Sequence, residues 1–349
     1  MNEKIRIFNH LWHAAHQHSL VQIPDTKWSW LENHRRFFSS SPRGNMIEDY
    51  DIEIVDKYEP GKYDVALLHL DQQCFEDDIW EMGKGSLFRT LNELITDIPK
   101  ICLMHGTPYY PEYFRSDINK DNYKELGFTE KQIGMSSVLI NKFKEAVKDC
   151  SVVIFNSYTA KSQWGFDDDD RGVAIWHGMD KDEWLDLPKE PRVVTMISPG
   201  GLDKYYDRTF LRAVKEELFE RDIMHCHITV DVQFKSFDEY RNFLGRSLIY
   251  FNPTRESCMP RARSEAMMSG CCVLTTPHQD ADMFIKTGEN GIIVPRNPKV
   301  VADIIEGLIY DYKKAIKIGQ EGRKTAIEIF KPERFRKEWR DILKKLLNK

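Results

Sequence analysis

The sequence lacks the features that would place the protein in a membrane or among secreted disulfide proteins. Its 349 residues contain no apolar run of about 18 residues, the length that a spanning helix needs. The N-terminal segment has neither the basic start nor the long apolar core of a signal peptide. Its seven cysteines form no Cys-x-x-Cys pair, which argues against a disulfide framework or a zinc site. We therefore expect a cytoplasmic protein with at most a peripheral contact to a membrane.

An excess of positive charge is also missing. A net charge of -5 gives no global electrostatic reason to bind nucleic acid, although it leaves room for a local basic groove. Hydrophobic residues at 41% and charged residues at 30% are typical of a globular protein rather than a disordered or fibrous one. At roughly 150 residues per domain, the length predicts about two domains, each with its own core.

Short β-type segments alternate with longer helical patterns along the chain, which is typical of parallel sheets covered by helices. The expected strands comprise residues 4–9, 51–56, 63–70, 99–106, 150–157, 191–198, 225–232, 247–253, 271–276 and 291–295. The expected helices comprise residues 85–96, 130–148, 206–220, 236–244, 260–269, 298–314 and 333–347. Two α/β domains in tandem leave a cleft between them, and a ligand is expected at the carboxyl ends of the strands that face it.

The stretch from Trp164 to Arg192 is the expected linker between the two halves. Its acidic run at 167–170 and its prolines predict a solvated, poorly helical segment rather than a divalent-ion site. We expect an N-terminal domain over 1–172 and a C-terminal domain over 173–332. The final segment, 333–349, carries a helical apolar stripe and many basic residues. We expect it to pack against the N-terminal domain, and a membrane-surface helix is the alternative.

The segment ESCMPRARSEAMMSGCCVLTT, from Glu256 to Thr276, combines two acids with the start of a helix. Pro260 suits the first helical position and Gly270 suits the residue after the helix end. The start of such a helix presents backbone N–H groups and a positive dipole end, which favours a diphosphate. Glu265 lies about one and a half turns into the helix and Glu256 lies on the loop before it. Because carboxylates hold the vicinal hydroxyls of ribose and pyranose rings, the segment predicts a site for a nucleotide diphosphate sugar.

The same residues carry a resemblance to a known family. FNPTRESCMPRARSEAMMSGCCVLTT, followed by DADMFIKTGENGIIVP, resembles the donor-binding signature of the GT-B glycosyltransferases of family 4. That signature is an acid, a short loop, a second acid followed by Ala-Met, a small residue with glycine, a strand and a Gly-x-Asn-Gly hairpin. The segments ICLMHGTP, SVVIFNSYTAKSQWG and AIWHGMDKDEW are similar to further parts of the family. The resemblance covers most of residues 99–300.

The resemblance implies two Rossmann-like domains that face each other across a cleft and catalyse a retaining sugar transfer. It implies a nucleotide diphosphate sugar as the donor, most naturally a UDP-sugar, and neither a bound metal nor another cofactor. His105 and Glu256 would orient the donor sugar as catalytic residues, and Glu265 would bind the ribose. The further donor-binding residues that the resemblance implies are Lys204, Arg208, Arg261, Gly200 and Gly201. The departing phosphate would take the acceptor proton, so no dedicated base is implied.

Two departures from the family pattern leave alternatives open. Eight residues separate Glu256 from Glu265, one more than is usual, so either Glu256 or Ser257 faces the donor sugar. In SPGGLDKYYDR the family lysine corresponds to Lys204, but no arginine precedes it. Arg208 or Arg261 would then supply the missing charge next to the diphosphate.

The first fifty residues depart most, because no glycine-rich turn follows the first strand. This region contains His10, His13, His16 and His18, and no nearby carboxylate or cysteine completes a metal shell. We expect His13 and His16 to contribute to acceptor binding instead. The acceptor itself stays open between a glycan, a lipid-linked sugar acceptor and a small molecule. A glycosyltransferase that acts on modified nucleic-acid bases and an inactive GT-B binding module are the alternative functions.

Overall fold

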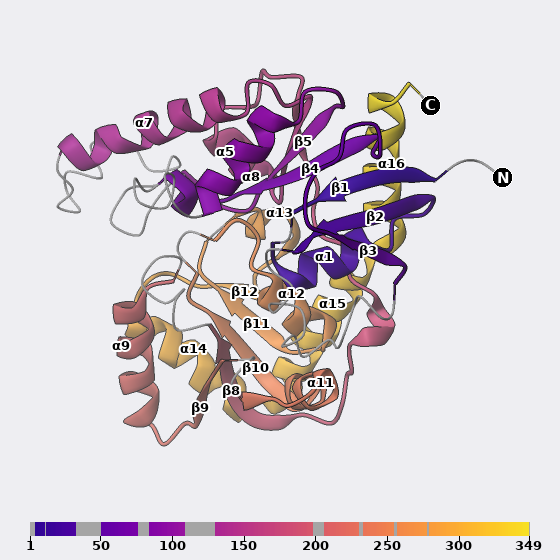
Figure 1. Cartoon of the computed structure of the whole chain (residues 1–349). Coiled ribbons are helices and arrows are strands. Elements are labelled where there is room, and N and C mark those ends of the chain that lie inside the picture. Colours follow the sequence, from indigo (N-terminus) through magenta and orange to yellow (C-terminus); the bar gives the residue numbers. More distant parts are fainter. Residues whose placement is uncertain are drawn as a thin grey trace. The chain divides into compact units, whose positions relative to one another are not determined.

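The computed structural model describes residues 4–10, 12–32, 50–75, 84–108, 130–197, 206–229, 233–254, 257–277 and 279–348. The chain divides into two compact units, which Figure 1 shows coloured along the sequence. Unit 1 comprises Met1–Gly178 and Pro332–Lys349, and unit 2 comprises Met179–Lys331. Each unit is built on a parallel sheet with helices, so the predicted α/β fold class is confirmed.

Unit 1 is organised around a parallel sheet that has seven strands within the described residues, in the order β3-β2-β1-β4-β5-β6-β7. Its strands are β1 (Ile5–Asn9), β2 (Thr26–Leu31), β3 (Ile52–Val55), β4 (Val65–Leu70), β5 (Lys100–Met104), β6 (Val152–Phe155) and β7 (Gly172–Ala174). Every residue of β4 and β5 is buried. A parallel sheet that is covered on both faces explains why these strands read as continuous apolar runs in the sequence.

The helices of unit 1 include one from the far end of the chain. They are α1 (Ala14–Leu20), α5 (Lys84–Leu94), α7 (Glu130–Ala146), α8 (Tyr158–Gln163) and α16 (Pro332–Leu346), with a 3-10 turn at Gln72–Phe75. Phe335, Trp339 and Leu343 of α16 are buried in one apolar cluster with Ile5 and Trp28. Figure 1 shows α16 beside the strands at the N-terminal end of the chain. The prediction that this helix returns to the N-terminal half is confirmed, and its apolar stripe is used in the core rather than at a membrane surface.

The expected linker is more structured than its composition suggests. Residues 172–174 form β7 and pair with β6, so the segment up to Gly178 joins unit 1 instead of starting a C-terminal domain at 173. Trp164 and Phe166 are fully buried in the unit 1 core. The first part of this stretch is therefore packed rather than solvated, because its aromatic side chains and its strand pairing outweigh its acidic composition. The boundary between the two units nevertheless falls within the expected linker, after Gly178.

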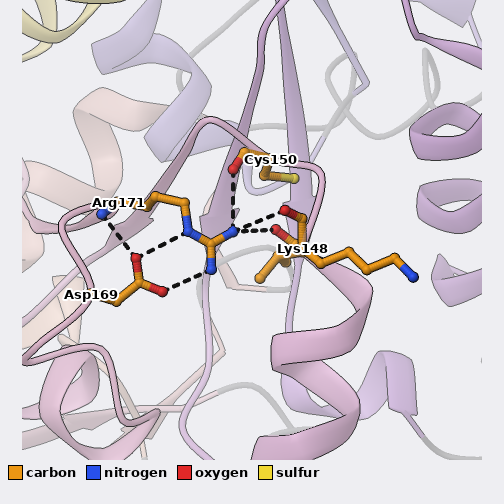
Figure 2. A network of polar contacts seen from close by, with 5 residues as sticks. Lys148, Cys150, Asp169 and Arg171 are labelled. Atoms are coloured by element: carbon orange, nitrogen blue, oxygen red, sulfur yellow. Dashed lines mark hydrogen bonds and ion pairs between the residues drawn. The ribbon is translucent and has the colours of Figure 1, made fainter.

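The acidic run at 167–170 is largely exposed and binds an arginine side chain. The Asp169 carboxylate accepts hydrogen bonds from the Arg171 side chain at 2.7 and 3.0 Å, as Figure 2 shows. Nη1 of Arg171 in turn donates to the carbonyl oxygens of Val147, Lys148 and Cys150 at 3.1 to 3.4 Å. Hydrogen bonding from Arg171 lowers the pKa of the Asp169 carboxyl. This network satisfies carbonyl groups just after the end of α7, where a helix leaves its last acceptors unpaired.

Unit 2 contains a parallel sheet with five strands among the described residues, in the order β12-β11-β10-β8-β9. These are β8 (Glu190–Met196), β9 (His225–Ile228), β10 (Ser247–Asn252), β11 (Cys272–Thr275) and β12 (Ile292–Ile293). The helices are α9 (Arg208–Phe219), α11 (Phe237–Arg246), α12 (Arg261–Met268), α13 (Ala281–Phe284), α14 (Pro298–Tyr310) and α15 (Tyr312–Ile329), with a 3-10 turn at Lys181–Glu183.

Two of the differences from the sequence prediction have a clear local cause. β2 was not expected, because TKWSWL lies in a polar stretch and gains its strand character from pairing with β1 and β3. The helix expected over 298–314 consists of two helices that meet at Asp311. The Asp311 side chain accepts a hydrogen bond from the backbone N–H of Lys314 at 3.1 Å and so caps a new helix. No helix in the described part of the chain is long and apolar enough to cross a membrane.

Candidate functional site

Helix α12 follows the carboxyl end of β10 and begins without a side-chain cap. Its N-cap residue is Pro260, which makes no side-chain hydrogen bond to the first turn. By contrast, α9, α11 and α14 are capped by the side chains of Asp207, Ser236 and Asn297. A helix start that no N-cap side chain occupies is suited to an anionic group of a ligand. At the other end Gly270 follows the helix with a φ of +69°, the left-handed conformation predicted for this glycine.

Glu265 is held between two side chains on the inner side of α12. Its Oε2 accepts a hydrogen bond from the hydroxyl of Tyr240, and its Oε1 lies 3.4 Å from Nε of Arg261. The Glu265 side chain is only 10% exposed, which excludes a freely solvated helix acid. An ionised carboxylate has about four lone-pair sites and can accept several hydrogen bonds at once. The i, i+4 pair with Arg261 fixes the direction in which the carboxylate points.

Arg263 has a different environment from Arg261, as expected for residues two apart on a helix. It is fully buried, and its Nη2 donates to the carbonyl oxygen of Gln279 at 3.2 Å. Its guanidinium also lies 5.2 Å from the centre of the Phe284 ring. Burial lowers the pKa of Arg263 to about 10, and the buried carboxylate of Asp280 opposes this shift. Arg263 therefore packs the interior of unit 2 beneath the start of α12.

The start of α9 and the loop before α12 lie side by side. Tyr206 forms an isolated antiparallel bridge with Thr254, and its side chain hydrogen-bonds Ser257. Burial raises the pKa of the Tyr206 hydroxyl to about 12, so it stays protonated at neutral pH. This contact places Arg208, which is exposed in the first turn of α9, at the same edge of the sheet as the start of α12.

Several predicted donor residues cannot be placed by the structure. Glu256, Lys204, Gly200 and Gly201 lie outside the described residues. The structure therefore brings together Arg261 and Glu265 in unit 2, with Arg208 on the same sheet edge, and leaves the choice between Glu256 and Ser257 as a prediction.

In unit 1 the structure gathers three of the predicted histidines at the carboxyl end of the sheet. His105 directly follows β5, and its backbone N–H donates to the carbonyl oxygen of Leu70 at 2.7 Å. The rings of His13 and His16 lie edge-on to the His105 ring, with centroids 5.1 and 5.4 Å away. His13 is exposed, His105 is partly exposed and His16 is buried. The side chains expected for the donor sugar and for the acceptor are therefore neighbours.

His69 and Trp12 complete this group and were not predicted. Nδ1 of His69, at the end of β4, lies 2.8 Å from Nε2 of His105. The Trp12 ring stacks on the His105 ring at 5.7 Å and on the His69 ring at 6.2 Å, with interplanar angles of 11° and 9°. The sequence does contain a signal for His69. It is the only polar residue in the apolar strand VALLHL, and the polar residue Asp71 follows directly after that strand. His18 lies elsewhere, next to Tyr50.

The rings of His69 and His105 are neutral. Burial lowers the pKa of both His69 and His105 well below the ordinary value, and the neighbouring histidines lower them further. A neutral imidazole has one donor and one acceptor nitrogen, which suits hydroxyl groups better than anions. Within the described ranges, no group of three or more His, Cys, Asp or Glu side chains is arranged to hold a metal ion.

Comparisons with known proteins agree with this architecture. HepE from Anabaena in complex with UDP-glucose has a TM-score of 0.64 at 13% sequence identity, covering 98% of this chain and 100% of that chain. Sucrose-phosphate synthase from Thermosynechococcus elongatus has a TM-score of 0.60 at 11% identity, covering 99% and 100%. A glycosyltransferase from Rickettsia africae has a TM-score of 0.60 at 14% identity, covering 99% of both chains. The fold is therefore that of the GT-B glycosyltransferases.

A family comparison adds the activity class. The family model of glycosyl transferases group 1 matches residues 214–325, which lie within unit 2 and contain α12 with Arg261 and Glu265. No curated protein matches the chain at a significant level. Fold and matched domain together define the protein as a glycosyltransferase, as the sequence motif predicted.

Proposed function

We propose that the protein is a retaining glycosyltransferase, similar to family 4, that transfers a sugar from a UDP-sugar to a hydroxyl-bearing acceptor. The observation that carries this proposal is Glu265, which Arg261 and Tyr240 hold at the uncapped start of α12 within the matched domain. Complexes of HepE with UDP, with UDP and glucose and with UDP-glucose support uridine diphosphate as the nucleotide part of the donor.

The proposed roles follow the chemistry of each side chain. Glu265 accepts hydrogen bonds from the ribose hydroxyls, and the start of α12 receives the diphosphate with Lys204 and either Arg208 or Arg261. Backbone N–H groups and cations of this kind stabilise the charge that develops on the departing diphosphate, so no metal or other cofactor is required. His105 and Glu256 orient the donor sugar.

The acceptor side is proposed for unit 1. His13 is exposed and adjoins His105, so an acceptor hydroxyl near His13 and His16 would lie beside the sugar that His105 orients. A glycan, a lipid-linked acceptor and a small molecule all offer such a hydroxyl. All seven cysteines are free thiols, which supports a cytoplasmic location for the enzyme.

The first test is a thermal-shift screen of UDP-, GDP- and ADP-sugars. A donor at one hundred times its Kd stabilises the folded state by about 2.7 kcal/mol, which raises the melting temperature by several degrees. We expect one UDP-sugar to do so, with and without EDTA. If no nucleotide sugar shifts the melting temperature, the proposed function is wrong.

The second test follows the reaction catalysed with the donor found in that screen. NMR of the product should show the same anomeric configuration as the donor, and the inverted anomer would contradict the retaining mechanism. Binding with neither transfer nor hydrolysis would identify an inactive binding module. Strongly salt-dependent transfer to DNA would instead identify a nucleic-acid-base acceptor.

A further inference from the structure

Three polar side chains are buried behind His105 and take no part in the roles proposed so far. Asn9, at the end of β1, Gln17, in α1, and His69, at the end of β4, are all fully buried. Burying a polar side chain destabilises a protein unless its hydrogen bonds are made. The three residues make these bonds to one another and form a chain that ends at His105.

In this series of hydrogen bonds, each atom can be assigned as a donor or as an acceptor. Nδ2 of Asn9 donates to Oε1 of Gln17 at 2.8 Å, so Oδ1 of Asn9 is the atom that faces Nε2 of His69, also at 2.8 Å. An amide oxygen can only accept, and Nε2 of His69 therefore carries the ring proton. Nε2 of Gln17, an amide donor, lies 3.2 Å from the same nitrogen. We assign the ring proton by the shorter contact to Oδ1 of Asn9, and with that proton in place the contact to Gln17 is not a hydrogen bond.

The tautomer of His69 in turn determines the tautomer of His105. A neutral His69 with a proton on Nε2 has an unprotonated Nδ1, which must accept from Nε2 of His105 at 2.8 Å. The planes of the two rings differ by 20°, and with the two nitrogens 2.8 Å apart the N–H of His105 points close to the plane of the accepting ring. Trp12 packs nearly parallel to both rings and so restricts their rotation. The remaining nitrogen of His105, Nδ1, is left as an acceptor.

We infer that His69 is a positioning residue that fixes the tautomer of His105, so that His105 accepts a hydrogen bond from a ligand hydroxyl through Nδ1. The ligand at this point is a neutral hydroxyl-bearing group and not a phosphate or carboxylate, because an unprotonated nitrogen repels an anionic oxygen. Identifying that group as the donor sugar rests on the proposed function, whereas the tautomer itself does not.

The decisive measurement is the tautomer of His105 in the intact protein labelled with 15N-histidine. Long-range 1H–15N spectra distinguish the two neutral tautomers, and a His105→Gln variant identifies the His105 signals by their loss. We expect the proton on Nε2 in the wild-type protein at pH 7. A proton on Nδ1 would overturn the inference, and this result needs no variant of His69 to fold.

Variants of His69 then test its role. His69→Phe keeps a ring for stacking but removes the acceptor, so the His105 signals should move to the other tautomer or to a mixture. His69→Asn places an amide oxygen near the position of Nδ1 and should restore the wild-type tautomer. His18→Phe, on the same helix as Gln17 but outside the chain of bonds, is the matched control. An unchanged tautomer in His69→Phe would contradict the positioning role.

Kinetics with the donor identified by the nucleotide-sugar screen link the tautomer to function. Loss of one ligand hydrogen bond is worth roughly 1 kcal/mol, so His69→Phe should raise the donor KM about fivefold to tenfold. His69→Asn should stay close to wild type. A merely structural role would lower the active fraction, and thus kcat, with the KM unchanged, and that outcome would overturn the inference. If the wild-type protein binds no nucleotide sugar, the proposed function fails while the tautomer result stands.

Discussion

The carboxyl ends of the two sheets carry different chemistry, although both sheets are parallel and covered by helices. At the end of the unit 1 sheet, His69 and His105 are neutral rings stacked on Trp12. In unit 2, α12 follows the carboxyl end of β10 and carries paired charged side chains instead, with Glu265 next to Arg261. The difference fits the two tasks proposed for these edges, since a neutral edge suits hydroxyl groups and a charged edge suits a nucleotide diphosphate.

The largest effect is expected in unit 2, where replacing a buried charged side chain should lower the stability of the unit. Arg263→Ala removes a fully buried side chain that donates to the carbonyl oxygen of Gln279 and packs on the Phe284 ring. The cavity and the lost hydrogen bond should together destabilise the protein by about 3 kcal/mol or more. Hydrogen exchange followed by mass spectrometry should show this loss in peptides of unit 2. Arg212→Ala, at a side chain that is 79% exposed, is the control and should change little. A comparable loss for both variants would contradict the buried role of Arg263.

A smaller effect is expected when the ligand-facing acid is removed. Glu265→Ala deletes a carboxylate that would accept from the ribose hydroxyls, which we expect to weaken donor binding by roughly 2 kcal/mol, or about thirtyfold in donor KM. Steady-state kinetics over a range of donor concentrations measures this change. Glu328→Ala, at an acid of the same unit whose side chain is 72% exposed, should leave the KM unaltered. Wild-type kinetics in Glu265→Ala would remove the ribose role.

The smallest expected effect is a difference between the two units in how much stability each loses in acid, and it arises from their buried histidines. Burial lowers the pKa of His69 and His105 in unit 1 and that of His225 in unit 2, to about 3 for His225. Since an unfolded histidine has a pKa near 6.5, the unfolded chain binds more protons below that pH, and stability falls as the pH falls. With two such rings against one, unit 1 should lose about 1 kcal/mol more than unit 2 between pH 7 and pH 5.5.

Hydrogen exchange at both pH values, corrected for the intrinsic exchange rates, gives the stability of each unit. A His225→Asn variant should make unit 2 less sensitive to acid and so widen the difference between the units. A greater acid loss in unit 2 than in unit 1 would show that the neutral histidine edge is not the more pH-sensitive one.

The sequence was most informative where local pattern decides the structure. Continuous apolar runs predicted β4 and β5, because strands buried on both faces need such residues. The pair of Arg261 and Glu265 was not predicted, although it too follows from local spacing, since the two residues are four positions apart on one helix. In contrast, β2 depends on its neighbours in the sheet, and the acidic run at 167–170 gave no sign that Arg171 would bind the end of α7.

The histidine group shows most clearly what local pattern cannot provide. His13 and His16 are close in the sequence, but His69 and His105 are 36 residues apart and meet only because β4 pairs with β5. The strand register places Leu70 opposite Met104, so the side chains at the ends of both strands lie at one level. The sequence alone does not give this register, so it predicts that a lone histidine in an apolar strand is a core residue.

The position of α16 has a consequence for how the protein is made. Trp339 and Leu343 belong to the same core as Ile7 and Trp30, although unit 2 lies between them in the chain. The whole of unit 2 is therefore synthesised before α16, the helix that covers this face of the unit 1 sheet. Until then the nascent chain carries an incomplete unit 1 with an uncovered apolar surface. Synthesis of α16, rather than of residues 1–178, therefore completes unit 1.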